Sequence, residues 1–239
     1  MHGGTAGLLS RGGSALVLGA SGGIGRAVAH GLVGSGCFAR VFEASRSGTP
    51  RVDLEDEESI QALATEISDS EFALRLVLDA TGFLHDERFR PERSWRHLET
   101  AHLEKSFCVN AIGPALLMKH LLPLFPRRGK AVFATLSARV GSIGDNGYGG
   151  WYAYRASKAA LNQLVRTASI ELSRRCPDAI CVAVHPGTVE TPLTAPYSKQ
   201  GLNVRSPEQA ATQLISVLDG LSAAQSGTFL DYRGEVLPW

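Results

Sequence analysis

Cysteine is scarce in this sequence, with four residues in a chain of 239. Cys37, Cys108, Cys176 and Cys181 show no Cys-x-x-Cys spacing, which argues against a disulfide-rich secreted domain and against a zinc site. We expect all four to be free, buried thiols in a reducing compartment. On this basis we expect the protein to be cytoplasmic.

An excess of charge of either sign is also missing, because 24 Lys and Arg residues are balanced by 23 Asp and Glu residues. Such a balance gives no electrostatic reason to expect nucleic acid or an anionic membrane as a partner. No apolar run approaches the roughly 20 residues of a membrane span. The histidines His85, His97, His102 and His120 show no metal-ligand spacing. We therefore expect no nucleic acid, no membrane and no metal.

Strand-like apolar runs alternate with helical patterns along the chain. Alternation of this kind predicts right-handed βαβ units and a parallel sheet with helices on both faces. No Pro/Gly/Ser-rich linker interrupts it, so we expect a flexible, Gly-rich lead-in over 1–13 and one doubly wound Rossmann domain of the α/β class over 14–239. The strand-like runs are 15–18, 40–44, 74–78, 131–134, 180–184 and 228–232, with a short one near 51–53. The helical patterns are 24–33, 57–67, 103–124, 152–174 and 207–221.

A glycine cluster follows the first strand-like run and opens the first helical pattern. Gly19, Gly23 and Gly25 have the spacing Gly-x-x-x-Gly-x-Gly. Glycine permits a tight turn and a close backbone approach, and the free N–H groups of a helix N-terminus attract phosphate. The position of this cluster predicts a pyrophosphate-binding loop.

Tyr154 and Lys158 stand four residues apart in the helical pattern 152–174. This spacing puts both side chains on one helix face. A phenol titrates near ~10, and a cation held beside it lowers that pKa toward the range useful for acid–base catalysis. The pair by itself is equally compatible with a solvated helix face.

With the glycine loop and this pair together, the chain resembles the short-chain dehydrogenase/reductase family from 14 to 239. Asp79-Ala80-Thr81-Gly82 stands where the family has Asn-Asn-Ala-Gly, with Asp79 as a departure. Asn110, Ser137 and the segment from Pro186 to Thr191 match further family motifs in the correct order. The ending 226–239 resembles the C-factor-like and carbonyl-reductase-like branch.

The resemblance implies hydride transfer between a nicotinamide cofactor and a small-molecule carbonyl or alcohol substrate. It implies that Tyr154 is the general acid/base, that Ser137 positions the substrate oxygen, and that Lys158 and Asn110 complete the catalytic set. The cofactor-binding residues that it implies are Gly19, Ser21, Gly22, Gly23, Ile24, Gly25, Ser45, Arg46, Asp53, Leu54, Ala80, Thr81, Gly82, Tyr154, Lys158, Pro186, Gly187, Val189 and Thr191.

The end of the second strand decides the choice of cofactor, because an acid there bonds a ribose 2′-hydroxyl and a base accepts a 2′-phosphate. Ser45 takes the acidic position and Arg46 follows it. A guanidinium pairs well with phosphate, which favours NADP(H). Glu43 is the alternative, since it would select NAD if the strand register differed.

Pro114 provides a separate reason to expect a role for the backbone of Asn110. Proline has no N–H, so the carbonyl four positions earlier, that of Asn110, lacks its usual helical partner. In the resembled family this backbone holds a water that relays protons from the lysine. A merely kinked helix is the other interpretation.

Several expectations concern the surroundings of the site. Segment 191–205 resembles the family's substrate lid. Tyr148, Trp151 and Tyr152 are expected either to line the substrate pocket or to pack at a subunit contact. We expect 87–93 to be a solvated loop. The apolar excess of helices 103–124 and 152–174 predicts a homodimer or homotetramer. The apolar ending 237–239 is expected to dock on its own or a neighbouring subunit.

Two other functions share this fold. One is a catalytically idle nucleotide-binding or signalling protein, which would usually have lost the serine, tyrosine or lysine. The other is an NAD-dependent alcohol dehydrogenase, which cofactor titration would separate from a reductase.

Overall fold

A computed structural model describes residues 12–197 and 204–239. Its centre is a parallel six-stranded sheet in the order β2-β1-β3-β4-β5-β6. The predicted fold class is therefore confirmed. The strands are β1 Ser14–Leu18, β2 Arg40–Ala44, β3 Leu74–Asp79, β4 Ala131–Leu136, β5 Ala179–His185 and β6 Phe229–Asp231.

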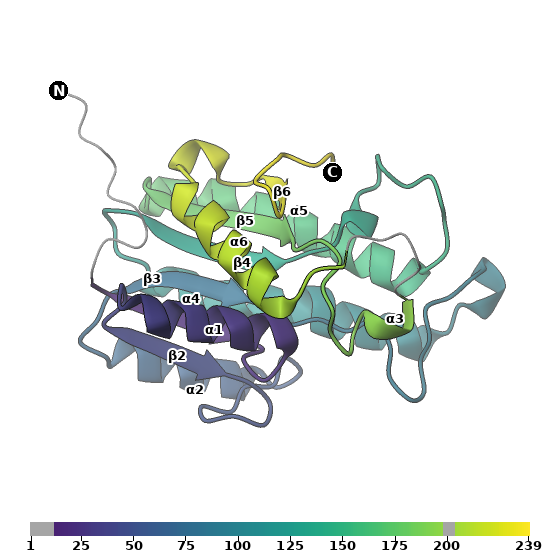
Figure 1. Cartoon of the computed structure of the whole chain (residues 1–239), viewed down its shortest axis with the longest axis horizontal. Helices are drawn as coiled ribbons and strands as arrows, with labels where there is room; N and C mark the ends of the chain where they lie inside the picture. Colours follow the sequence, from purple (N-terminus) through teal and green to yellow (C-terminus); the bar gives the residue numbers. More distant parts are fainter. Residues whose placement is uncertain (1–11, 198–203) are drawn as a thin grey trace.

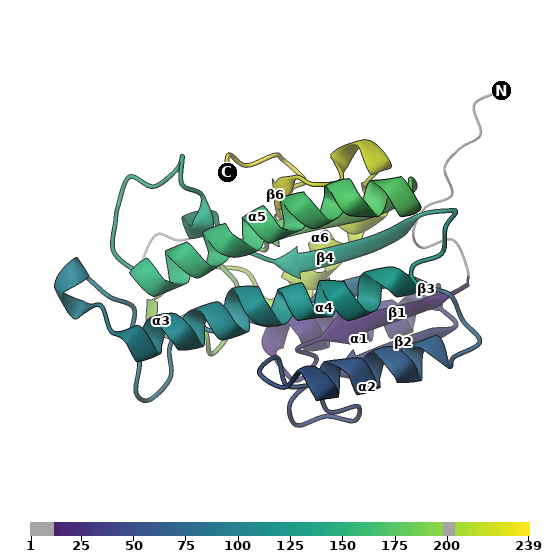
Figure 2. The ribbon, with the colours of Figure 1, turned by 180° about the vertical axis from the view of Figure 1, so that it is seen from behind.

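Helices cover both faces of the sheet. Helices α1 (Gly23–Ser35) and α6 (Pro207–Gly220) lie together on one face (Figure 1). Helices α2 (Glu57–Ser68), α4 (Gly113–Leu121) and α5 (Tyr152–Arg175) lie on the other (Figure 2). Helix α3 (Thr100–Phe107) precedes α4 and packs beside α5.

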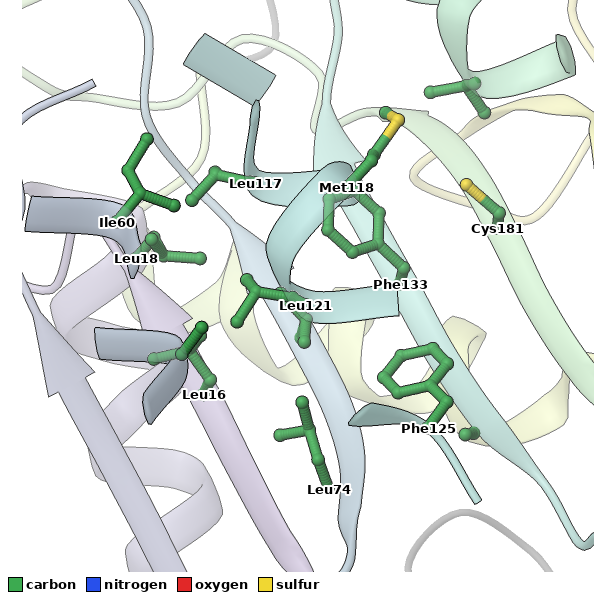
Figure 3. Packing of buried hydrophobic residues seen from close by; sticks show 14 of the residues in the cluster. Leu16, Leu18, Ile60, Leu74, Leu117, Met118, Leu121, Phe125, Phe133 and Cys181 are labelled. Carbon is green, nitrogen blue, oxygen red and sulfur yellow. The ribbon is translucent and has the colours of Figure 1, made fainter. Parts of the chain in front are cut away.

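Alternation along β1 separates the two cores. Leu16 and Leu18 face the layer of α2, α4 and α5, where they pack with residues such as Leu117 and Phe133 (Figure 3). Ala15 and Val17 face the layer of α1 and α6. Successive strand side chains point to opposite faces, so a strand buried on both sides is a continuous apolar run.

The short strand expected near 51–53 is wrong, because only an isolated bridge joins Ser45 and Arg51. The Asp53 backbone is hydrogen-bonded to a side chain instead of to a neighbouring strand. The N–H of Asp53 donates to Ser59 Oγ at 3.0 Å, and Ser59 Oγ donates to the Asp53 carbonyl at 3.1 Å. These groups are therefore not available for a longer ladder.

The helix expected over 103–124 begins earlier, at Thr100, and is not one continuous α-helix. Its α-helical parts flank a π-helical turn at Cys108–Ile112, where the N–H of Gly113 donates to the carbonyl of Cys108. Pro114 follows directly and has no N–H to give to Asn110, so the change of hydrogen-bond pattern falls where proline removes a donor. The water relay stays a prediction.

By length and composition alone, Thr100–Leu124 could cross a membrane. This is weak evidence, since core helices of soluble proteins pass the same test. Leu117 and Leu121 are fully buried against the sheet here.

The four cysteines are free, as expected, but only Cys176 and Cys181 are buried. Cys37 and Cys108 are partly exposed, and Cys37 packs against the edge of the core beside α1 and α6.

The chain's carboxyl end docks on its own subunit. The Trp239 ring stacks on Phe229 at 6.0 Å, and the Trp239 carbonyl accepts hydrogen bonds from Gly144 N and Ser142 Oγ. The expected lead-in over 1–13 lies almost wholly outside the described residues.

Candidate active site

The carboxyl ends of the strands meet at one edge of the sheet, as parallel pairing requires. Leu18 pairs with Asp79, Asp79 with Thr135, and Leu136 with Val184. The residues that follow β1, β3, β4 and β5 are therefore brought to the same crevice, which is where doubly wound sheets bind ligands.

The glycine loop has the geometry of a phosphate cradle. Gly19 has φ +75°, and a Cβ there would meet the Ala80 carbonyl oxygen at 2.9 Å. A Cβ on Gly25 would collide with the carbonyl oxygen of Gly19. Helix α1 has Gly22 as its N-cap, with no side-chain cap and no acid in its first turn. Its first N–H groups are thus open to an anion, so the loop fits a dinucleotide pyrophosphate.

Two cavities meet at this loop and share Gly22, Arg46, Ala80, Thr81 and Gly82. The smaller, of about 230 Å³, reaches toward β2, and the larger, of about 650 Å³, extends over β4 and β5. Every cofactor-binding residue expected from the sequence lines one or both cavities, and Ser137 lines the larger one.

The end of β2 separates Arg46 from Glu43. Ser45 and Arg46 line the smaller cavity with the glycine loop. Exposed Glu43 lies inside the strand and does not line that cavity; it borders an adjoining surface hollow, which shares Ser21 and Ser45 with the cavity.

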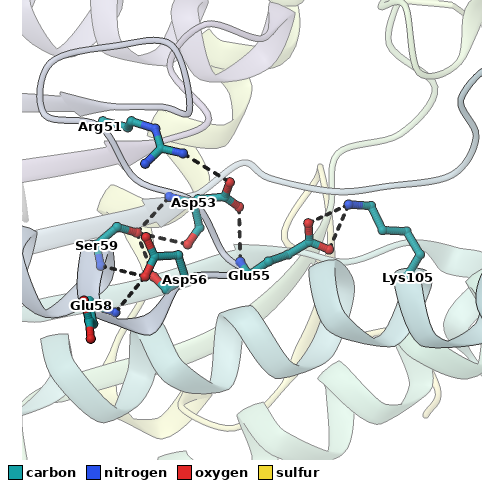
Figure 4. A network of polar contacts seen from close by, with 7 residues as sticks. All are labelled: Arg51, Asp53, Glu55, Asp56, Glu58, Ser59 and Lys105. Atoms are coloured by element: carbon teal, nitrogen blue, oxygen red, sulfur yellow. Dashed lines mark hydrogen bonds and ion pairs between the residues drawn. The ribbon is translucent and has the colours of Figure 1, made fainter.

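A polar network surrounds Asp53 at the outer end of the smaller cavity (Figure 4). Arg51 approaches the Asp53 carboxylate at 3.7 Å, and Glu55 N donates to it at 3.2 Å. Beside them, Lys105 donates to both Glu55 oxygens at 2.7 and 2.8 Å. Glu55 and Lys105 also line the cavity, and no sequence motif singled them out.

Tyr154 and Lys158 lie in the first turns of α5 and both line the larger cavity. Both are buried, and Lys158 Nζ lies 6.0 Å from the Tyr154 ring centroid. The ammonium donates to the Leu136 carbonyl at 2.7 Å. Burial lowers the pKa of Lys158 to about 8, and the charge of Asp79 opposes that shift.

The phenol does not show the lowered pKa expected from its lysine neighbour. Burial raises the pKa of Tyr154 to about 12. The reason is that desolvation disfavours the phenolate, while the Lys158 ammonium points to a carbonyl instead of to the phenol.

Asp79, the departure from the family motif, is fully buried and forms three hydrogen bonds. It accepts from Thr81 N at 3.0 Å, Thr81 Oγ1 at 2.5 Å and Thr135 Oγ1 at 2.7 Å. A carboxylate only accepts, so two hydroxyls and an N–H suit it. It fixes the 80–82 turn against β4.

Asn110 lies outside both cavities and braces them from behind. Its Oδ1 accepts from Phe83 N at 2.8 Å, and its Nδ2 donates to the Phe83 carbonyl and to Ser157 Oγ. The side chain, which is fully buried, thereby ties the loop after β3 to α5 next to Lys158.

Ser137 is buried at the end of β4. Its N–H donates to the Val184 carbonyl at 2.8 Å, and its hydroxyl donates to Asn162 Oδ1 at 2.7 Å. Asn162 lies on α5 two turns after Tyr154, and it was missed in the sequence. The signal was its spacing, because 154, 158 and 162 follow each other at four-residue steps.

Aromatic rings form one wall of the larger cavity. Trp151 lies 6.2 Å from Tyr154 and 5.2 Å from Tyr197, and His85 lies 5.3 Å from Tyr197. Trp151 has φ 54°, a rare conformation for a bulky residue. Tyr148 contributes nothing here: it is 97% exposed, because it lies in the loop before α5. Tyr152 does not line the cavity either.

The segment expected to be a lid meets the cavity through Thr191, Pro192, Leu193, Thr194 and Tyr197. His85 Nε2 contacts the Leu193 carbonyl at 3.1 Å. The rest of the segment, 198–203, lies outside the described residues.

The loop 87–93 is not uniformly solvated, contrary to expectation. Glu92 is buried, and its carboxylate pairs with His102 Nδ1 at 3.1 Å. Its backbone carbonyl accepts from Trp151 N at 2.6 Å, and its carboxylate accepts from Ala153 N. A negative side chain suits the N-terminus of α5, which explains its burial.

His185, at the end of β5, completes the floor of the larger cavity. Burial and the nearby positive charge of Arg139 lower its pKa to about 4, so the imidazole is neutral at physiological pH. Within residues 12–197 and 204–239, no three His, Cys, Asp or Glu side chains gather as metal ligands would.

Comparison with known proteins agrees with this site. A family model described as short chain dehydrogenase matches residues 14–201. The chain is 31% identical over 234 residues to 1-hydroxy-2-glutathionyl-2-methyl-3-butene dehydrogenase of Rhodococcus sp. (strain AD45), covering 94% of this chain and 98% of that protein. It is 35% identical over 142 residues to the C-signal of Myxococcus xanthus, covering 59% and 81%.

Among solved structures, the fold is similar to NADPH-bound carbonyl reductase from chicken fatty liver. The TM-score is 0.82 at 26% identity, covering 96% of this chain and 100% of that one. The family match, the sheet and the shared cavity agree, and the chain belongs to the short-chain dehydrogenase/reductase family of oxidoreductases.

Proposed function

We propose that this protein is an NADP(H)-dependent reductase of small-molecule carbonyl compounds, with Tyr154 as the proton donor. One observation carries the proposal: Ser137, Tyr154 and Lys158 line the same cavity as the glycine loop. A cofactor seated on the loop and a substrate oxygen near the tyrosine would then share one space. The idle nucleotide-binding alternative is less favoured, because no member of this set is lost.

The bound nicotinamide would supply the hydride. Tyr154 would give its proton to the substrate oxygen as negative charge develops there. Burial raises the pKa of Tyr154 to about 12, so the phenol of the empty site carries its proton at neutral pH. Lys158, whose ammonium donates to the Leu136 carbonyl on the same cavity wall, would contact the cofactor's ribose. Ser137 would orient the substrate oxygen.

The preference for NADP(H) rests on Arg46. Its side chain is exposed and lines the cleft with the glycine loop, where a 2′-phosphate would lie, whereas Glu43 does not line that cleft and borders the hollow beside it. A guanidinium pairs with a phosphate dianion through charge-assisted hydrogen bonds. The carbonyl reductase of similar fold was solved with NADPH, which agrees with this preference.

The substrate would be apolar around its carbonyl group. Trp151, Tyr197, Leu193 and Val140 surround the open part of the larger cavity. Among the residues that the structure describes, Arg139 is its one charged neighbour beyond the cofactor region. Arg139 is itself paired with Asp145 at 2.6 Å. Aromatic and aliphatic walls favour aldehydes, ketones or quinones over sugars.

A screen of NADPH consumption over ketones, aldehydes, quinones and 3-oxo esters tests this, with NADH in parallel. The relative from Rhodococcus is named a dehydrogenase of an alcohol, so alcohols with NADP⁺ and NAD⁺ are the second arm. Tyr154→Phe is the control: turnover should fall by a factor of about 10²–10⁴, with little change in NADPH affinity. Wild-type turnover in Tyr154→Phe would contradict the mechanism.

We also propose a homodimer or homotetramer, since Ile112 and Ile170 on the outer faces of the two long helices are about half exposed. Light scattering tests this, and a monomer mass at all concentrations would refute it. A cytoplasmic location is proposed from the free cysteines and is tested by cell fractionation.

A further inference from the structure

Asn162 and the substrate oxygen would compete for the one proton of the Ser137 hydroxyl. A serine hydroxyl has one proton, and in this structure Ser137 gives it to Asn162 Oδ1 at 2.7 Å. To orient a carbonyl oxygen, Ser137 must point the same proton at the substrate. The bond to Asn162 therefore has to change when substrate binds.

The Nδ2 group of the Asn162 amide could form a hydrogen bond to Ser137 in place of this one. Asn162 is 3% exposed, and its Nδ2 has no hydrogen-bond partner in the described part of the chain. A buried, unpartnered amide is uncommon and calls for an explanation. Its neighbours on the same helix face, Tyr154 and Lys158, are catalytic, and the unpaired group is in a side chain that contacts Ser137 directly.

A half-turn of the amide about its Cβ–Cγ bond exchanges Oδ1 and Nδ2 with almost no change of shape. Nδ2–H would then donate to Ser137 Oγ, and the proton of Ser137 would be free for the substrate oxygen. No other uncharged side chain of this size offers an acceptor and a donor at exchangeable positions. The reverse rotation returns the Ser137 proton to Asn162 Oδ1, so that Ser137 Oγ can accept a hydrogen bond from the hydroxyl of an alcohol.

We propose that Asn162 is a positioning residue for Ser137, which holds the hydroxyl proton in the resting site and releases it to the substrate oxygen by turning its amide. The proposal rests on the proposed function and extends it to a residue outside the catalytic set. It predicts that the contribution of Asn162 to turnover passes entirely through Ser137.

The experiment is a double-mutant cycle of Ser137→Ala with Asn162→Asp and with Asn162→Ala. Asp has the shape of Asn, but when ionised it only accepts, so it should retain the Ser137 proton. Each Asn162 variant should lower kcat by about 10-fold, a part of the 10²–10³ that loss of an oxyanion donor costs, while the Kd for NADPH stays within about two-fold. In the Ser137→Ala background the same changes should have no further effect on kcat.

Ser169→Ala is the matched control, because Ser169 is equally buried on α5 and, within 12–197 and 204–239, its hydroxyl bonds only to the Arg166 carbonyl. It should leave kcat unchanged. Losses in kcat that multiply in the double variants, or unchanged kcat in both Asn162 variants, would overturn the proposal. A variant with a general folding defect would lose NADPH binding. If Asn162→Ala does so, the cycle with the isosteric Asn162→Asp decides whether the proposal holds.

A second readout does not need turnover. If the unmodified protein reduces nothing in the screen, the proposed function fails, and urea unfolding of the same cycle tests the pair alone. Coupled losses of stability for Ser137→Ala and Asn162→Ala support the contact, and additive losses refute it.

Discussion

Lys158→Met should stabilise the cofactor-free protein at neutral pH, although it removes a residue of the proposed catalytic set. Burial lowers the pKa of Lys158 from its ordinary 10.5 to about 8. At pH 7 the lysine is therefore protonated in both the folded and the unfolded chain, and folding has to bury its charge. The difference between the two pKa values corresponds to about 3 kcal/mol of lost stability. Methionine fills similar space without the charge.

The hydrogen bond from Lys158 to the Leu136 carbonyl reduces this gain. Its loss costs about 1 kcal/mol, so the net stabilisation of Lys158→Met at pH 7 is about 2 kcal/mol. As pH rises through 8, the folded lysine loses its proton while the unfolded lysine keeps it. The unfolded state then binds more protons, and the wild type gains stability with pH.

By about pH 9.5 the penalty for burying Lys158 shrinks by about 2 kcal/mol, which removes the advantage of methionine. Urea unfolding of both proteins from pH 6.5 to about 9.5, without cofactor, measures this. Lys119→Met is the control, because its side chain is 62% exposed and should show no such gain. A Lys158→Met protein that is less stable at pH 7, or a difference that is flat with pH, would refute the reasoning.

Three further predictions follow from particular contacts. Arg46→Ala should weaken NADPH binding about 10-fold or more, as expected for a lost charge-assisted bond, and leave NADH nearly unchanged in fluorescence titrations; equal losses would point to Glu43. Gly25→Ala should abolish NADPH binding because its Cβ would meet the Gly19 carbonyl, whereas Gly34→Ala, on the same helix with open space around it, should bind normally. His102→Leu should lower the free energy of unfolding by about 1–3 kcal/mol, since the buried Glu92 carboxylate would lose one of its hydrogen-bond partners; an unchanged urea midpoint would show that Ala153 N alone satisfies the carboxylate.

The stability lost by burying Lys158 illustrates a general property of such sites. A site that holds an ammonium and a phenol out of water is less stable than an apolar core of the same volume. The free energy lost by burying these groups is regained only when a cofactor and a substrate bind to them. Substitutions at the proposed catalytic residues can therefore raise the stability of the empty protein.

The sequence by itself determined the sheet and the places of the glycine loop and of the proposed catalytic set. Each depends on local information: apolar runs for strands, glycine spacing for the turn after β1, and four-residue steps for Tyr154 and Lys158. Parallel pairing then brings all strand ends to one edge, so residues that follow strands could be assigned to one site before any contact was known.

Only the tertiary structure decided which neighbours complete the site. Glu92 stands in a loop that was expected to be solvated, and no motif singled out His102. Both are buried, because the N-terminus of α5 meets the loop after β3. The partner of Ser137 and the direction of the Lys158 ammonium depend on side-chain packing between β4 and α5, which no spacing rule contains. The raised pKa of Tyr154 has the same origin: burial is a property of the whole fold, and it outweighs the lysine four residues away.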